Sequence, residues 1–354
     1  MAKSVTLNVV GVGYWGPKLI RNFLRIPGVR IRTVADIKPE RLEEIGRQFP
    51  DIELLSNDPE AALSDPIADG VIIATPVHTH GEFVRQAIEH GKDVFVEKPL
   101  CCCPLEAAEL VAAAEARGVL LCVGHVYMFH PSVLQAKSLI QSGELGNVRY
   151  LTATRTNFGP IRHDVSALWD LGCHDVGVFL DWLQSDPISV TARGQSYLLP
   201  DIEDLSFATY TFPNGVLAHV KSSWLSLRKV REITVVGDTG MLVLDDMNPE
   251  ALLTLYRHPL RLDDCGSGLH GWTGAGTVIR EEQIRISCGE GEPLAHECRH
   301  FVDCLIARTE PINSGAFALR VLRTLEAAER SMRNHSQLVR LSAPQHADES
   351  AIPV

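Results

Sequence analysis

Residues 5–16, VTLNVVGVGYWG, decide the fold of this chain. The apolar run Val5–Val10 is typical of a buried strand, and the six residues after it form a G-x-G-x-x-G. Pro17–Ile26 follows with the amphipathic spacing of a helix, whose first turn tolerates Pro17 because the N–H that proline lacks would be unbonded there. A glycine hexapeptide between a strand and a helix is the pattern of a dinucleotide-binding turn.

Each glycine of this turn has a separate physical task. Gly11 permits the tight turn, Gly13 lets the backbone approach a pyrophosphate, and Gly16 allows helix and strand to pack closely. Asp36 ends the next apolar run, and its carboxylate suits the adenosine ribose hydroxyls while repelling a 2′-phosphate. Asp36 therefore favours NAD over NADP. Lys38 could relax that preference, which leaves NADP as the weaker alternative. The residues expected at this end of the cofactor are Gly11, Val12, Gly13, Tyr14, Trp15, Gly16, Asp36, Ile37 and Lys38.

Residues 1–125 alternate short apolar runs with amphipathic stretches, which predicts an α/β Rossmann domain with a doubly wound parallel sheet. The five strands expected after the first are Val29–Asp36, Ile52–Ser56, Gly70–Thr75, Asp93–Val96 and Val119–Val123. Ligands of such sheets bind beyond the carboxyl ends of the strands. The loop from Thr75 to His80 is therefore expected to line the cofactor, with Ala74, Thr75, Pro76 and His80 as its contacts.

Residues 126–340 have a different pattern, which predicts a C-terminal α+β domain with a large, mainly antiparallel open sheet. Helices are expected at Leu134–Ser142, Leu168–Leu183, His296–Arg308 and Ala316–Asn334. Strands are expected at Val148–Thr156, Ile188–Tyr197, Leu205–Phe212, Val216–Trp224, Arg231–Val236, Met241–Leu244 and Leu252–Tyr256. Residues 263–276 are expected to form a Gly-rich loop, and residues 341–354 a polar tail that is expected to be flexible.

Composition excludes several classes of function. A net charge of −11 without a basic block argues against a nucleic-acid partner. No apolar run is long enough to span a bilayer and the N-terminus lacks a secretory pattern, so a cytoplasmic protein is expected. The 9 cysteines include the consecutive Cys101–Cys103 and do not form a disulfide framework. This run is either reactive or simply small and apolar, and no metal site is predicted.

Two segments carry residues suited to hydride transfer from an alcohol. Lys98, at the carboxyl end of the fifth strand, could stabilise a developing alkoxide, although a surface lysine is the simpler interpretation. Asp170 and His174 are four residues apart in a predicted helix and share a face. His174 could accept the hydroxyl proton, and Asp170 could hold a substrate hydroxyl or orient the His, with Asp175 as a weaker alternative carboxylate. A helix-capping Asp and a buried structural His remain the alternative interpretation.

These motifs together resemble the Gfo/Idh/MocA oxidoreductases. The resemblance rests on GVGYWG at 11–16, ATPVHTHGEFVRQAIEHGKDVFVEKPL at 74–100, VGHVYMFHP at 123–131 and WDLGCHD at 169–175. It implies that Lys98 is the catalytic lysine, that His174 is the general acid/base, that Asp170 contacts a sugar hydroxyl, and that Glu97 contacts the nicotinamide ribose. The substrate-side candidates that it implies with Lys98, Asp170 and His174 are Tyr127, Arg155, Asn157 and Trp169.

The resemblance leaves the substrate open. Met128 and His130 stand where members often have an arginine and an asparagine. A nucleotide-linked sugar oxidised at carbon 3 is the first expectation, and a free sugar, an inositol or an aminocyclitol is the alternative. A non-catalytic regulatory protein that binds NAD or sugar is the alternative of another class. The resemblance also implies a homodimer or homotetramer formed through the C-terminal sheet.

Overall fold

The computed structural model describes residues 4–257 and 282–341, which form two compact units. The first unit comprises the described residues of Met1–His130 together with Gly291–Arg323. The second comprises the described residues of Pro131–Glu290 and of Thr324–Val354. Residues 126–340 were expected to form one domain, whereas Gly291–Arg323 belong with the first unit.

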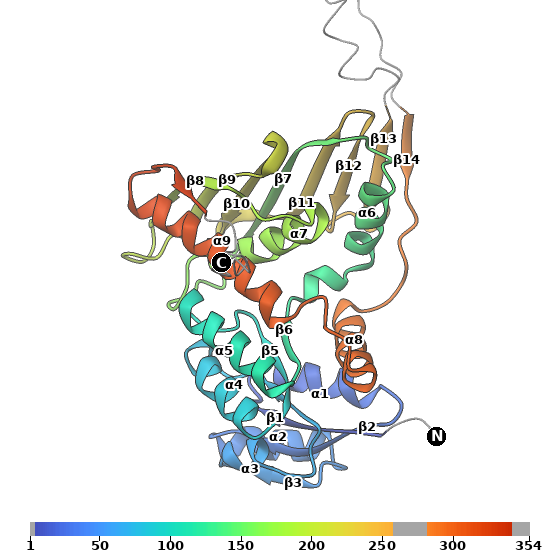
Figure 1. Ribbon diagram of the computed structural model, residues 1–354, viewed down its shortest axis with the longest axis vertical. Helices are drawn as coiled ribbons and strands as arrows, with labels where there is room; N and C mark the ends of the chain where they lie inside the picture. Colours follow the sequence, from blue (N-terminus) through green and yellow to red (C-terminus); the bar gives the residue numbers. More distant parts are fainter. Residues whose placement is uncertain (1–3, 258–281, 342–354) are drawn as a thin grey trace, which may run out of the picture. The chain divides into compact units, whose positions relative to one another are not determined.

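A six-stranded parallel sheet forms the centre of the first unit, in the order β3-β2-β1-β4-β5-β6 (Figure 1). The strands are β1 Val5–Val10, β2 Val29–Ala35, β3 Leu54–Ser56, β4 Gly70–Ile73, β5 Asp93–Glu97 and β6 Leu121–Gly124. This order confirms the predicted doubly wound sheet. The strand order reverses between β1 and β4, and this reversal is where ligands of such folds bind.

Helices cover both faces of this sheet. They are α1 Gly16–Leu24, α2 Pro39–Gln48, the short α3 Glu60–Leu63, α4 His80–Glu89, α5 Pro104–Arg117 and α8 Pro293–Ala307. Three edge-to-face rings, Phe23 of α1, Phe95 of β5 and Phe301 of α8, have their centroids 5.6–6.1 Å apart. Because this aromatic cluster is buried, it explains why α8 joins the first unit although it lies late in the chain.

The second unit contains a nine-stranded sheet in the order β14-β13-β12-β11-β7-β10-β9-β8-β15. Its strands are β7 Val148–Phe158, β8 Ser189–Gln195, β9 Leu205–Thr211, β10 Leu217–Ser223, β11 Leu225–Gly237, β12 Gly240–Asp245, β13 Leu253–Arg257, β14 Glu282–Arg285 and β15 Val339–Arg340. Strands β7 and β10 run parallel and the other neighbours antiparallel, which confirms the predicted mainly antiparallel sheet.

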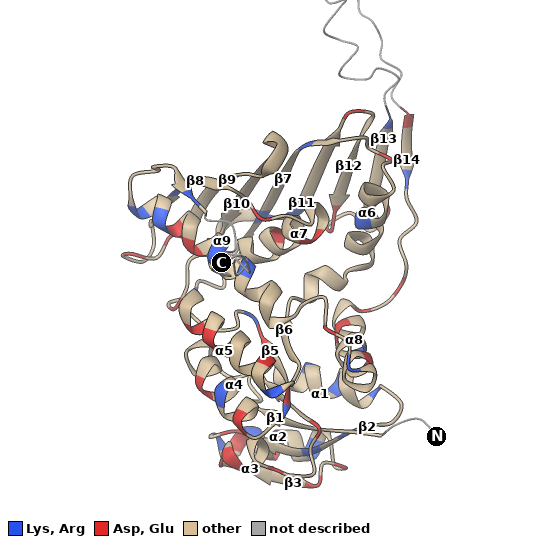
Figure 2. Cartoon of the chain, in the orientation of Figure 1, with Lys and Arg blue, Asp and Glu red and all other residues tan. Residues whose placement is uncertain are grey.

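Helices α6 Pro131–Gln141 and α7 Cys173–Leu183 belong to the second unit, and α9 Gly315–Arg333 contributes residues to both units. The Gly-rich loop expected at 263–276 lies outside the described residues, as does all of the expected tail except residue 341. Acidic and basic side chains are interleaved along the helices (Figure 2). Within residues 4–257 and 282–341, no helix combines the length and the apolar character needed to cross a membrane.

Candidate active site

The glycine turn after β1 has the shape that its sequence predicts. Gly11 has a φ of +91°, and a Cβ built on it would lie 2.7 Å from the Ala74 carbonyl carbon. A Cβ on Gly16 would lie 2.5 Å from the Gly11 carbonyl oxygen. A Cβ on Gly13, in contrast, would meet no atom of the described chain within 4 Å. Gly11 and Gly16 are therefore required by packing, whereas Gly13 leaves the room that an approaching pyrophosphate needs.

Asp36 is bonded to the same turn. Its two carboxylate oxygens accept hydrogen bonds from the backbone N–H groups of Val12 (2.8 Å) and Lys38 (2.9 Å). A carboxylate has about four acceptor positions, so both oxygens can still accept from ribose hydroxyls. Asp36 thus fixes the turn through its carboxylate. The neighbouring Ile37 is 73% exposed.

Lys18, which the sequence analysis did not single out, adds a cation to the turn. Its Nζ lies 3.4 Å from the ring centroid of Tyr14 and 4.6 Å from that of Trp15, and both rings are exposed. Its hydrogen bond and its charge lower the pKa of the Tyr14 hydroxyl. The sequence signal that could have identified Lys18 is its position in the helix that directly follows the glycine motif.

Thr75, Pro76 and His80 follow β4. The Thr79 hydroxyl lies 2.7 Å from the Thr75 hydroxyl and 2.8 Å from the Pro76 carbonyl oxygen. His80 was expected to border the cofactor, but its side chain is buried inside the first unit. Its ring nitrogens lie 2.8 Å from the carbonyl oxygens of Thr75 and Pro99, so its polar atoms are engaged by the backbone.

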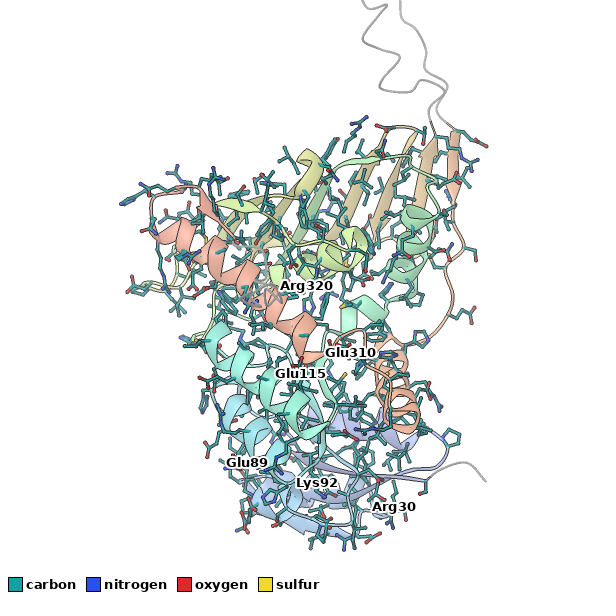
Figure 3. All side chains as sticks on the ribbon, viewed as in Figure 1. Arg30, Glu89, Lys92, Glu115, Glu310 and Arg320 are labelled. Carbon is teal, nitrogen blue, oxygen red and sulfur yellow. The ribbon has the colours of Figure 1, made fainter. Side chains whose placement is uncertain are left out.

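Glu97 and Lys98 stand at the carboxyl end of β5. Burial raises the pKa of Glu97 to about 7, although the charges of Lys98 and Lys18 act in the opposite direction. Lys92, labelled in Figure 3, precedes β5 at its other end, and its ammonium donates to the Ala68 carbonyl oxygen at 2.9 Å. The chain thus has a structural lysine before β5 and a lysine at the ligand-binding edge after it.

His125, Asn313 and Glu297 form a buried polar cluster close to Glu97. His125 follows β6, and burial, followed by the charge of Lys98, lowers its pKa to about 4. The Asn313 amide donates to the Val123 carbonyl oxygen (2.7 Å) and to Glu297 of α8 (3.1 Å). Burial, with a smaller contribution from Glu97, raises the pKa of Glu297 well above its usual range. Glu297 and Asn313 were not predicted, because nothing in the sequence relates α8 to β6.

The motif WDLGCHD begins in a π turn over Leu168–Gly172 that the sequence did not predict. Asp170 lies in this turn and is partly exposed. Its carboxylate accepts hydrogen bonds from the Trp224 indole (3.2 Å) and from the Arg162 guanidinium (3.3 Å), two partners that the sequence analysis missed. Wide turns of this kind frequently mark functional sites.

Helix α7 follows this turn and places His174, also partly exposed, in its first turn. A Cβ on Gly172 would lie 2.8 Å from both Leu168 Cδ1 and Ser222 Oγ, so this glycine lets the turn pack onto β10. Asp175, the weaker alternative carboxylate, is buried in an ion pair.

The partner of Asp175 is Arg155 of β7, at 2.7 Å between Nη2 and Oδ1. Arg155 is 3% exposed, and its Nε is also within hydrogen-bonding distance of Asp175. The expected substrate contact thus lies inside the second unit and holds α7 to the sheet.

Two of the other substrate candidates, Tyr127 and Trp169, are buried. Tyr127 and Trp169 are 6% and 9% exposed, and the Asn157 amide donates to the Gly159 carbonyl oxygen at 2.6 Å.

In the cysteine run, Cys101 is buried and donates to the Cys103 carbonyl oxygen, and burial raises its pKa to about 12. Cys101 is thus an unreactive apolar residue, whereas Cys102 and Cys103 are exposed.

The fold and the glycine turn define a dinucleotide-binding oxidoreductase. Residues 5–125 match a model described as "Oxidoreductase family, NAD-binding Rossmann fold", and residues 133–243 match the GFO/IDH/MocA C-terminal domain. The chain belongs to the Gfo/Idh/MocA family, whose members are NAD-dependent dehydrogenases acting on CH–OH groups. The resemblance stated from the sequence is confirmed.

Individual relatives cover nearly the whole chain. Scyllo-inositol 2-dehydrogenase (NAD(+)) of Bacillus subtilis is 29% identical, over 94% of this chain and 96% of the relative. UDP-N-acetylglucosamine 3-dehydrogenase of Acidithiobacillus ferrooxidans is 27% identical, over 89% and 93%. The crystal structure of GenD2 from gentamicin A biosynthesis in complex with NAD is 25% identical, with a TM-score of 0.80 over 97% of this chain and 98% of that one.

Proposed function

We propose that this protein oxidises a secondary alcohol on the ring of a sugar-like substrate with NAD. A nucleotide-linked sugar is the first candidate substrate, supported by the likeness to UDP-N-acetylglucosamine 3-dehydrogenase over 89% of the chain. The observation that carries the proposal is the segment that joins the π turn to the first turn of α7. A partly exposed carboxylate, Asp170, and a partly exposed imidazole, His174, stand there on one short segment. A carboxylate suits a sugar hydroxyl, and an imidazole suits proton transfer near neutral pH.

The residues of the first unit fit the cofactor. The room at Gly13 and the carboxylate of Asp36 are suited to the pyrophosphate and the adenosine ribose, and the charge of Asp36 favours NAD over NADP. Bound NAD would supply the acceptor for the hydride. Glu97 would contact the nicotinamide ribose.

Each catalytic residue has one role. His174 accepts the proton of the substrate hydroxyl as the carbonyl forms. Lys98 stabilises the negative charge that develops on that oxygen. Asp170, held by Trp224 and Arg162, binds a neighbouring hydroxyl and fixes which ring carbon reacts.

A free inositol or sugar is the second candidate. The Arg162 guanidinium beside Asp170 is also bonded to Asp164, so two carboxylates surround one cation. This local excess of negative charge suits a neutral polyol better than a diphosphate. The nearly full-length likeness to an inositol dehydrogenase supports the same candidate.

A substrate panel tests the proposal. The purified protein with NAD or NADP is mixed with UDP- and dTDP-sugars, inositols, aminocyclitols and free hexoses, and formation of the reduced cofactor is followed. Turnover of a UDP-sugar well above that of the inositols supports the first candidate, and the reverse order supports the second. Tight NAD binding without any turnover would contradict the enzymatic proposal and favour a regulatory protein.

Two variants test the assigned roles. Lys98→Ala is expected to lower kcat by about two orders of magnitude, the usual cost of losing one preorganised charge, with NAD affinity nearly unchanged. His174→Ala is expected to remove the neutral-pH limb of the rate profile. Wild-type turnover in Lys98→Ala, or an unchanged limb in His174→Ala, would contradict these roles.

We also propose that the outer face of the nine-stranded sheet pairs with a second copy in a homodimer or homotetramer. Tyr150, Phe207 and Leu217, on three adjacent strands, are 44%, 38% and 46% exposed. Three large, exposed apolar side chains on one sheet face are an aggregation risk unless they are covered. Phe207→Glu with Leu217→Glu is expected to give monomers in light scattering after gel filtration, and an unchanged mass would contradict the proposal.

A further inference from the structure

His80 links two loops that leave neighbouring strands of the parallel sheet. Its Nε2 lies 2.8 Å from the carbonyl oxygen of Thr75, which follows β4. Its Nδ1 lies 2.8 Å from the carbonyl oxygen of Pro99, which follows β5. The residue is 1% exposed, so water does not compete effectively for either contact.

We propose that His80 is a positioning residue: its ring holds the Lys98–Pro99 segment against the Thr75 loop and so fixes where Lys98 presents its ammonium. This inference rests on the proposed function insofar as Lys98 acts in turnover. Both ring nitrogens are used within the first unit, so His80 acts through Lys98 and not by touching substrate or cofactor. An error of about 1 Å in the placement of a catalytic group costs about a hundredfold in rate.

The protonation state of His80 decides how many of these bonds form. A neutral imidazole has one N–H and donates to one carbonyl, whereas an imidazolium donates to both. Burial lowers the pKa of His80, the two carbonyl contacts oppose that effect, and the charge of His78 lowers the pKa further. The other charged groups next to this contact are Lys98, adjacent to Pro99, and Glu106 of α5, which packs against Gly81.

Two amide variants separate the two bonds. The Asn amide reaches the position of Nδ1 and can keep the bond to Pro99, whereas the Gln amide reaches the position of Nε2 and can keep the bond to Thr75. If His80 acts through Pro99, His80→Gln is expected to lower kcat about tenfold or more. His80→Asn is expected to lower it less, and NAD affinity should change less than twofold in both. His90→Gln is the matched control, because His90 caps the exposed other end of α4.

Two spectroscopic readouts do not need turnover. In ¹⁵N-histidine spectra, the His80 signal, identified by its loss in His80→Asn, is expected to titrate below the ordinary midpoint of about 6.5. In spectra of ¹³C-methylated lysines, the Lys98 signal, identified with Lys98→Arg, is expected to shift in His80→Gln and to stay in place in His90→Gln.

The outcomes distinguish this inference from the proposed function. If no substrate is oxidised but both spectroscopic results hold, the proposed function fails and the positioning role stands. If the His80 signal titrates at or above the ordinary midpoint of about 6.5, or if the Lys98 signal does not respond to His80→Gln, the inference is wrong even in an active enzyme. Wild-type kcat in both amide variants, with folding verified by thermal denaturation, would also overturn it.

Discussion

Gly13→Ala separates the two roles that a glycine can have in the dinucleotide turn. The position has no positive φ, and its Cβ would meet no described atom within 4 Å. The folded protein therefore has room for the methyl group. At a site of this kind, Gly→Ala usually stabilises a protein by about 0.4–1 kcal/mol, because the unfolded chain loses freedom. The unfolding temperature without cofactor should thus be unchanged or slightly higher.

Cofactor binding should respond in the opposite way. The methyl group would occupy the space through which a pyrophosphate approaches the backbone N–H groups. A hydrogen bond to a charged group contributes about 1.5–3 kcal/mol, so losing one corresponds to NAD binding weakened by about 10- to 100-fold. Isothermal titration with NAD measures this change, and differential scanning fluorimetry without NAD measures stability.

Gly11→Ala is the matched control. Gly11 has a φ of +91°, and its Cβ would lie 2.7 Å from the backbone of Ala74. A strained backbone conformation of this kind costs about 1–3 kcal/mol before the collision is added. Gly11→Ala is therefore expected to lower the unfolding temperature clearly, unlike Gly13→Ala. NAD affinity at the wild-type level in Gly13→Ala would refute the assignment of this space to the pyrophosphate.

Three further predictions follow from single contacts. Asp36→Ala should weaken NAD binding and reduce the NAD-over-NADP ratio in titrations, because the discriminating charge is lost; an unchanged ratio would place the discrimination elsewhere. Because burial raises the pKa of Glu97 to about 7, the folded state holds a proton that the unfolded state releases, and stability is lost as pH rises towards 7. Glu97→Gln should thus gain in Tm relative to wild type between pH 5 and pH 8, and a constant difference would contradict the shift. Arg155→Met should destabilise the protein by about 3–5 kcal/mol in denaturant unfolding, since it leaves the buried Asp175 carboxylate unpaired; a loss below about 1 kcal/mol would show that the pair is dispensable.

The glycine turn and the parallel sheet were predictable because local rules decide them. An apolar run, a glycine hexapeptide and an acidic residue at the end of the next strand require only neighbouring residues, and the right-handed crossover then limits the strand order. Asp36 shows the limit of this reasoning. Its residue type indicated a ribose contact, but its bonds to Val12 and Lys38 depend on the folded turn.

Long-range packing was not predictable in the same way. Helix α8 pairs with α1 through Phe301 and Phe23, residues far apart in a chain whose second sheet lies between them. The strands β14 and β15 have 4 and 2 residues and no alternating apolar pattern, so their sequences resemble loops. The π turn before α7 packs onto β10 at Gly172 and has no sequence signal of its own.

Arg155 shows that a local rule can outweigh a chemical expectation. Its type and its place in the resemblance suggested a substrate contact, yet Leu151, Ala153 and Arg155 are all buried on one face of β7. Side chains two residues apart share a face of a strand, so the apolar character of 151 and 153 already indicated an inward Arg155. A buried guanidinium needs a buried carboxylate, and Asp175 is the acidic residue that directly follows His174. The same pair therefore holds the helix that carries His174, and Arg155 supports the site from inside the fold.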